Sequence, residues 1–138
     1  MSKLDIFVLP HCGAGIGDIK KLEELFSCFD VSFNTNCTTY DEINNTKKSG
    51  EWFFVIYDNE IVDVPLLEAL PDMLEVFHVN VWVFYKRRSK EDKFVPERSP
   101  RMFRSDIKLQ SGSLIPLYDP EKKIETETIL DGWIIEEC

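Results

Sequence analysis

Residues 52–60, WFFVIYDNE, decide how this chain is expected to fold. Aromatic and β-branched residues run without interruption from Trp52 to Tyr57, and this run predicts a central strand that is covered on both faces. Two carboxylates, Asp58 and Glu60, follow the strand directly. Ligands in open α/β sheets bind beyond the carboxyl ends of the strands, so these two acids are the first candidates for a functional site.

Strands and helices are expected to alternate on both sides of that strand. The predicted order is a strand at 4–10, a helix at 19–29 after Asp18, a strand at 31–34, a short helix after Thr38 or Thr39, a helix capped by Asp63, and a strand at 79–85. Pro71 should kink or break the helix that Asp63 begins. This alternation predicts the α/β class: a single three-layer domain with a mostly parallel sheet flanked by helices.

The last third of the chain has a different character. Residues 89–100 are charged, include two prolines and lack periodicity, which indicates a loop. Short strands are expected near 102–109 and 114–118, with weak alternation at 122–129 and an apolar patch at 133–135. We therefore expect residues 1–88 to form the core and residues 89–138 to add a loop and a short antiparallel C-terminal extension within one domain.

The composition narrows the classes of partner. Hydrophobic residues make up 43% of the chain, which is enough for a real core. The formal net charge of −9 makes nucleic acid an unlikely partner and favours a protein with a basic surface.

No apolar run is long enough to span a membrane, and we expect no secretory signal before the first strand. The four cysteines form no Cys-x-x-Cys pair, so we expect a reduced, cytoplasmic protein.

Two features near the N-terminus are weaker candidates. Gly13, Gly15 and Gly17 stand between a predicted strand and a predicted helix, where backbone N–H groups attract anions. The run is neither a dinucleotide-binding fingerprint nor a P-loop, so a plain strand-to-helix turn is the alternative. His11 and Cys12 follow the first strand and suggest a nucleophile or a metal ligand, but they have no partner at a typical spacing.

Residues 44–88 resemble the middle of family-2-like glycosyltransferases, which have the nucleotide-diphospho-sugar transferase (GT-A) fold. The sequence KSGEW at 48–52 matches the Gly-Glu-Trp-like turn of that family, and Asp58-Asn59-Glu60 occupies the position of its Asp-x-Asp motif. The sequence PRMFR at 100–104 is similar to a Pro-Arg-x-Phe-Arg segment of some members. The resemblance implies a truncated or degenerate member of the family.

The resemblance also implies roles for particular residues. Asp58 and Glu60 would hold Mg²⁺ or Mn²⁺, which would bridge the two phosphates of a nucleotide-diphospho-sugar. Asp131 would be the catalytic base that activates an acceptor hydroxyl. Arg101 and Arg104 would contact the diphosphate, since Arg is suited to bidentate phosphate contacts.

Gly13 and Gly15, from the glycine-rich turn described above, join Arg101 and Arg104 as the candidate nucleotide-binding residues. The chain departs from the family pattern in three ways: Glu60 replaces the second Asp, the segment before the motif strand is short, and no Glu-Asp pair follows. The residues alone leave alternatives open, because Asp58-Asn59-Glu60 can be a polar turn and the two arginines can form surface ion pairs. The alternative function is that of a non-catalytic acidic interaction protein, such as a viral or phage accessory protein, on a degenerate version of the same scaffold.

Overall fold

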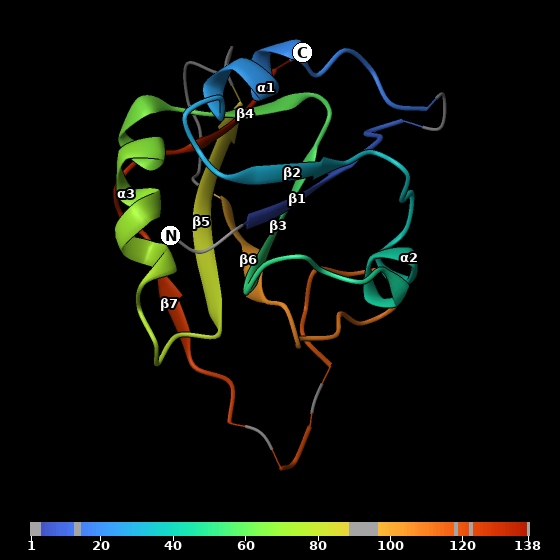
Figure 1. Ribbon diagram of the computed structural model, residues 1–138, viewed down its shortest axis with the longest axis vertical. Coiled ribbons are helices and arrows are strands. Elements are labelled where there is room, and N and C mark those ends of the chain that lie inside the picture. Colours follow the sequence, from blue (N-terminus) through green and yellow to red (C-terminus); the bar gives the residue numbers. More distant parts are fainter. Residues whose placement is uncertain (1–3, 13–14, 89–96, 118, 122, 138) are drawn as a thin grey trace.

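The computed structural model describes residues 4–12, 15–88, 97–117, 119–121 and 123–137. In these described residues, three helices and one sheet are present, and Figure 1 shows the helices around the sheet. The elements in chain order are β1 (Leu4–Leu9), α1 (Lys20–Leu25), β2 (Val31–Asn34), α2 (Tyr40–Asn45), β3 (Trp52–Tyr57), β4 (Glu60–Val62), α3 (Val64–Leu74), β5 (Val81–Arg88), β6 (Glu97–Arg104), β7 (Thr126–Thr128) and β8 (Ile134–Glu136).

The sheet has a parallel region and a mixed region. Its strand order is β2-β1-β3-β6-β5-β8-β4, and β7 pairs with β5 outside this path. In the parallel region, β1 lies between β2 and β3 and runs parallel to both. In the mixed region, β6 is antiparallel to β3 and to β5, whereas β7 and β8 run parallel to β5.

The connection between β3 and β4 requires the sheet to curl. Only Asp58 and Asn59 separate these strands in the sequence, yet β6, β5 and β8 lie between them in the sheet order. A two-residue link cannot reach across three intervening strands that lie about 4.8 Å apart from one another in a flat sheet. The mixed region therefore curls back on itself, and the result is a half-barrel.

Both faces of the central strands are buried. Side chains alternate along a strand, so β3 contributes Phe54 and Ile56 to one core cluster, and Phe53 and Val55 to the other. The first cluster packs against α1 and α3, and the second packs against Ile43 of α2 and the segment that follows β6. Figure 1 accordingly shows α3 and α2 on opposite sides of the sheet. The prediction of a central strand covered on both faces is confirmed.

Local sequence patterns predicted the boundaries of several helices and strands correctly. The strand predicted at 52–57 is β3, with the same bounds. Asp63 caps α3 by accepting a hydrogen bond from the Leu66 N–H at 3.1 Å. Thr39 caps α2, because its hydroxyl accepts a hydrogen bond from the Glu42 N–H at 3.2 Å. Each of these contacts lies within three residues in the sequence, so the sequence pattern was sufficient to predict it.

The predicted fold class is wrong. The structure is richer in strand than in helix, and its mixed, curled sheet is not the helix-flanked, mostly parallel sheet of a three-layer α/β domain. Helices α1 and α2 have six residues each, too few to cover a wide sheet. Only residues 89–96 separate β5 from β6, whereas a parallel crossover needs about a dozen residues or more. This short connection makes β6 antiparallel to β5.

The position of β6 also corrects the expected C-terminal extension. Residues 97–104 belong to the last third of the chain, yet β6 lies in the middle of the sheet, between β3 and β5. The loop predicted at 89–100 lies partly outside the described residues, and its described part belongs to β6. The last third therefore completes the core sheet and is not an addition to its edge.

Two helix predictions also need correction. Helix α1 ends at Leu25, before the predicted end near Phe29, and Asp18 accepts a bond from the Lys20 N–H but is not the N-cap. Helix α3 continues through Pro71 to Leu74, so the proline does not break it. Among the described residues, none of the helices has the length and apolar character that crossing a membrane requires.

Candidate functional site at the carboxyl ends of β1 and β3

The carboxyl ends of β1 and β3 meet at one edge of the parallel region. Leu9 and Tyr57, the last residues of the two strands, are register partners. The Asp58 N–H continues this pairing with a 2.9 Å hydrogen bond to the Leu9 carbonyl. The residues that follow both strands are therefore brought together, and these include His11 and Asp58.

Asp58 orients His11 and anchors the turn before α1. Its Oδ1 accepts hydrogen bonds from the His11 backbone N–H, at 3.1 Å, and from the His11 Nδ1. Its Oδ2 accepts a 2.7 Å bond from the Gly17 N–H. Burial by itself raises the pKa of Asp58, but the bonds from Gly17 and His11 outweigh burial and lower the pKa below its usual value. The Asp58 side chain is 2% exposed and that of His11 is 47% exposed, so the imidazole has access to solvent.

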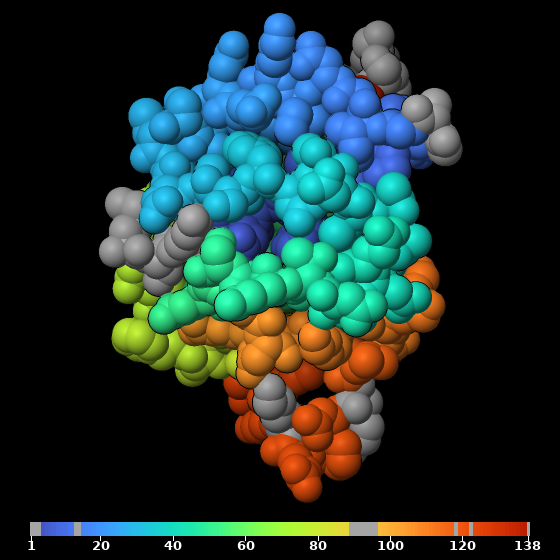
Figure 2. All heavy atoms as spheres, turned by 45° about the vertical axis from the view of Figure 1, so that its right-hand side comes forward, coloured from blue at the N-terminus to red at the C-terminus, as the bar shows by residue number. Residues whose placement is uncertain are grey.

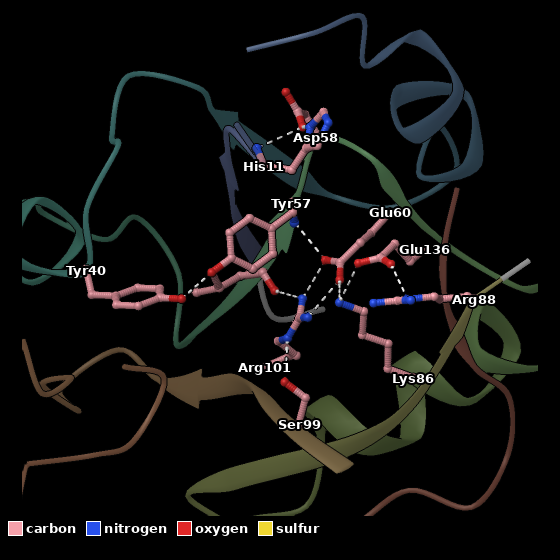
Figure 3. Close-up of polar contacts among 11 residues, drawn as sticks. His11, Tyr40, Tyr57, Asp58, Glu60, Lys86, Arg88, Ser99, Arg101 and Glu136 are labelled. Atoms are coloured by element: carbon pink, nitrogen blue, oxygen red, sulfur yellow. Dashed lines mark hydrogen bonds and ion pairs between the residues drawn. The ribbon is translucent and has the colours of Figure 1, made fainter. Parts of the chain in front are cut away.

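Glu60 has a different environment, inside the curl of the sheet. Figure 3 shows its carboxylate turned toward Arg101 and Lys86, while Asp58 lies beside His11. Arg101 of β6 binds Glu60 in bidentate fashion, with N–O distances of 2.7 and 2.8 Å. The Lys86 Nζ lies 2.7 Å from the same carboxylate, and the Tyr57 N–H donates to it at 2.8 Å. The Glu60 side chain is completely buried and that of Arg101 is 2% exposed.

The ionic network extends from the interior to the surface. Lys86 also contacts Glu136 at 3.2 Å, and Glu136 contacts the more exposed Arg88 at 2.9 Å. Burial raises the pKa of Glu60, but the hydrogen bonds and positive charges of Arg101 and Lys86 outweigh it and leave this pKa below its usual value. Glu60 in turn raises the pKa of Lys86 above its usual value, against the opposing effect of burial. All three groups in the interior therefore carry their charges at neutral pH.

Arg101 connects this network to a pair of tyrosines. Its guanidinium carbon lies 5.4 Å from the centre of the Tyr57 ring, and the Tyr57 hydroxyl is hydrogen bonded to the Tyr40 hydroxyl from α2. Burial is the main factor that raises the pKa of Tyr40, and the bond to Tyr57 raises it further. The Tyr40 phenol is therefore neutral at physiological pH. The buried ion pair thus supports one wall of the space beside α2.

A pocket of about 340 Å³ opens at this wall. Its lining residues include Leu9, Thr38, Tyr40, Asp41, Tyr57 and Ser111. The Ser111 hydroxyl donates to the Asp41 carboxylate at 3.1 Å, which joins the segment after β6 to α2. Asn44 strengthens this junction through 2.8 Å bonds to the backbone of Leu109. In Figure 2 the teal surface around α2 adjoins the orange surface of the segment after β6.

The predicted metal ligands do not form a shared site. Both oxygens of Glu60 are engaged by Arg101, and Lys86 adds a second positive charge within 3 Å of the carboxylate, so a divalent cation there would meet strong repulsion. Asp58 is directed toward His11 and Gly17 instead. Within the described ranges, no three His, Cys, Asp or Glu residues are grouped as a metal ion would require. The side chains present therefore do not fit a divalent cation held by Asp58 and Glu60.

The remaining predicted nucleotide-binding residues are dispersed. Arg104 pairs with Trp52, at the amino end of β3, where its guanidinium stacks on the Trp52 ring at 4.0 Å. The guanidinium also donates to the Val76 carbonyl at 2.7 Å, near the end of α3. Gly15 is exposed with a φ of 95°, and Gly13 lies outside the described residues. Arg101 contacts Tyr57, which lines the pocket.

Asp131 is positioned by the start of α3. The Asp63 carboxylate, which caps this helix, also accepts a 3.0 Å bond from the Trp133 N–H. Gly132 has a φ of 91°, and a Cβ there would lie 2.5 Å from Asp63 Oδ1, so only glycine fits this approach. Asp131 is therefore held in a groove beside α3, a different cavity from the pocket at Tyr40 and Tyr57.

The His11–Asp58 pair and the pair of tyrosines were not predicted from the sequence. A usable signal existed for the first pair: both residues follow predicted strands, and the carboxyl ends of parallel neighbours meet at one edge. No comparable signal existed for Tyr40 and Tyr57, because their contact depends on where α2 packs against the sheet.

Comparisons with known proteins leave the family unassigned. No protein-family model matches the chain. A search of curated proteins finds no match either. The resemblance of residues 44–88 to the GT-A glycosyltransferases therefore stays a prediction, carried by the motifs quoted above.

Proposed function

We propose that this protein is glycosyltransferase-like and binds a nucleotide sugar, with an uncharged ring of that ligand in the pocket beside Tyr40 and Tyr57. The observation that carries the proposal is the place of this pocket. It lies where two adjacent parallel strands, β1 and β3, reach their carboxyl ends, and Leu9 and Tyr57 line it. Ligands of open α/β sheets bind at this kind of edge.

The chemistry of the lining suits a sugar or a nucleoside ring. Threonine and serine hydroxyls can both donate and accept hydrogen bonds, and the Asp41 carboxylate can accept bonds from ligand hydroxyls. Tyrosine rings offer apolar faces on which a sugar or a base can pack. The volume of about 340 Å³ is within the range of small-molecule sites and accommodates one or two rings.

The proposal does not include a metal ion at Asp58 and Glu60, because the ion pairs of Glu60 oppose it. It also does not include transfer of the sugar by Asp131, which belongs to the groove beside α3. His11 is two residues after Leu9, which lines the pocket, and Asp58 orients its imidazole. We infer that the phosphates of the ligand lie toward His11.

Isothermal titration calorimetry tests the proposal, with UDP-glucose, GDP-mannose, uridine, guanosine and the two free sugars in separate experiments. The separate arms show whether the pocket selects the nucleoside or the sugar. Each titration is run with Mg²⁺ and with EDTA, and we expect the same affinity in both.

Asp41→Asn and Tyr40→Phe should each weaken binding about tenfold, the effect of one hydrogen bond of about 1.4 kcal/mol. The matched control is Tyr85→Phe, which removes a phenol outside the pocket lining. Absence of heat for every ligand, or equal affinities in Asp41→Asn and the wild type, would contradict the proposal.

A second candidate function is that of a non-catalytic interaction protein that engages a basic partner. The observation that favours it is the net charge of −9 together with a groove lined by carboxylates beside α3. The affinity for such a partner should fall as the salt concentration rises.

A further inference from the structure

A groove of about 450 Å³ lies between α3 and the segment that precedes β8. Its floor is apolar and is built by Ala69 and Met73 of α3, Trp82 of β5, and Ile129. The Trp82 side chain is held in place by a 3.2 Å hydrogen bond from its indole N–H to the Met73 carbonyl. The groove is therefore a preformed feature of the core edge.

Three carboxylates surround this apolar floor. Glu68 and Asp72 are one helical turn apart on α3, and Asp131 approaches from the opposite wall. All three side chains are exposed, and within the described part of the chain they form no ion pair. Of the described residues that line the groove, none is Lys, Arg or His, so the charge of this described lining is negative throughout.

Three exposed apolar side chains are next in the sequence to residues that line the groove. Val64, Phe77 and Leu130 are 59%, 88% and 76% exposed, respectively. Val64 begins α3 and Phe77 follows its end, so exposed apolar side chains flank both ends of this helix. Exposed large apolar side chains beside a groove are typical of surfaces that bind another molecule. A free metal cation or a polyamine would gain little from contact with these apolar side chains.

We propose that this groove binds a partner protein through an Arg or Lys side chain flanked by apolar residues. The apolar floor accommodates the methylene stem of that side chain, and the carboxylates of Asp72 and Asp131 pair with its charged end. Phe77 and Leu130 contact the flanking apolar residues. An anionic lipid surface is disfavoured, because the three carboxylates would repel it.

This inference rests on the second candidate function, which places a basic partner at this groove, and it is independent of the proposed nucleotide-sugar pocket at the carboxyl ends of β1 and β3. It assigns a role to Asp131 as a residue that binds a partner, in place of the catalytic base that the family resemblance implies.

Nuclear magnetic resonance of the ¹⁵N-labelled full chain tests the proposal. The probe is the peptide acetyl-Gly-Leu-Arg-Leu-Gly-amide, and the control peptide has citrulline in place of arginine, which has nearly the same shape without the charge. We expect the arginine peptide to shift the Trp82 indole N–H signal and the backbone signals of residues 68–76 and 129–132. The citrulline peptide should bind several-fold more weakly.

The double variant Asp72→Asn with Asp131→Asn should weaken binding of the arginine peptide by about 2–5-fold per carboxylate removed, since the pairs are exposed. The matched control is Glu23→Gln with Glu121→Gln, which removes the same charge from exposed sites outside the groove. Unchanged spectra of both variants in the absence of peptide will show that the fold is intact. Equal binding of the two peptides, equal weakening in the two variants, or no shift at the groove overturns the proposal.

Discussion

Asp58 and Glu60 are separated by a single residue in the sequence, but they lie in different regions of the molecule. Asp58 lies at the edge of the parallel region, where its partners are His11 and a backbone N–H. Glu60 lies inside the curl of the mixed region, where its partners are Arg101 and Lys86. The turn between β3 and β4 therefore directs two similar side chains into two different environments, one at the sheet edge and one in the interior.

The two carboxylates also differ in the groups that set their pKa values and in their structural roles. Both pKa values are below their usual values despite burial: hydrogen bonds from Gly17 and His11 lower that of Asp58, and hydrogen bonds and positive charges of Arg101 and Lys86 lower that of Glu60. Asp58 organises a surface turn beside a pocket. Glu60 neutralises a guanidinium that the core could not otherwise hold.

The largest expected effect comes from separating Glu60 from its partner. Arg101→Met leaves a buried carboxylate with Lys86 alone, and we expect a loss of about 3–5 kcal/mol in the free energy of unfolding. Urea denaturation at pH 7 measures this loss. The double variant Glu60→Met with Arg101→Met should recover much of it, because no buried charge is left uncompensated. If the double variant is less stable than Arg101→Met, the charge pair does not act as described.

A smaller loss is expected at the edge of the parallel region. Asp58→Asn removes a charged acceptor for two backbone N–H groups and the His11 imidazole, and should lower the free energy of unfolding by about 1.5–3 kcal/mol. The Gly17 amide should also exchange its hydrogen faster, because its bond to Oδ2 is weakened. Slow exchange of Gly17 in this variant would show that Asp58 does not anchor the turn.

Acid should destabilise the protein through both carboxylates. Their usual pKa values are 3.8 for Asp58 and 4.5 for Glu60, and both are lower in the folded protein. Their contribution to stability is therefore present at neutral pH and is lost as the pH falls through the folded pKa values, by about 1.4 kcal/mol for each unit of depression.

Urea denaturation at a series of pH values from neutral to acidic measures this loss. Asp58→Asn should show a shallower decline below about pH 4 than the wild type, because it lacks one of the two groups. A wild-type protein that becomes more stable as the pH falls through this range would contradict the direction of both pKa shifts.

The smallest effect concerns the tyrosines at the pocket. Because burial raises the pKa of Tyr40, an alkaline titration followed by ultraviolet absorbance should show a phenol that ionises well above the usual value of 10.0. Tyr40→Phe should abolish this late phase, whereas Tyr85→Phe should leave it in place. A late phase that persists in Tyr40→Phe would assign it to a different tyrosine.

The parts of the fold that sequence analysis predicted are the parts that depend on near neighbours. The bounds of β3 and the caps at Thr39 and Asp63 follow from residue types within a few positions of each other. The position of β6 between β3 and β5 was not predictable in this way. It depends on which distant strand offers a matching edge, and several antiparallel and parallel arrangements share the same local pattern.

The sequence by itself determined that a buried strand ends in two carboxylates, and that helices begin after Thr39 and Asp63. Only the tertiary structure determined which groups those two carboxylates contact. Glu60 and Arg101 are 41 residues apart, and His11 and Asp58 are 47 apart. Strand propensity and capping act over one turn or one pleat, whereas the partner of a buried charge is set by the curl of the whole sheet.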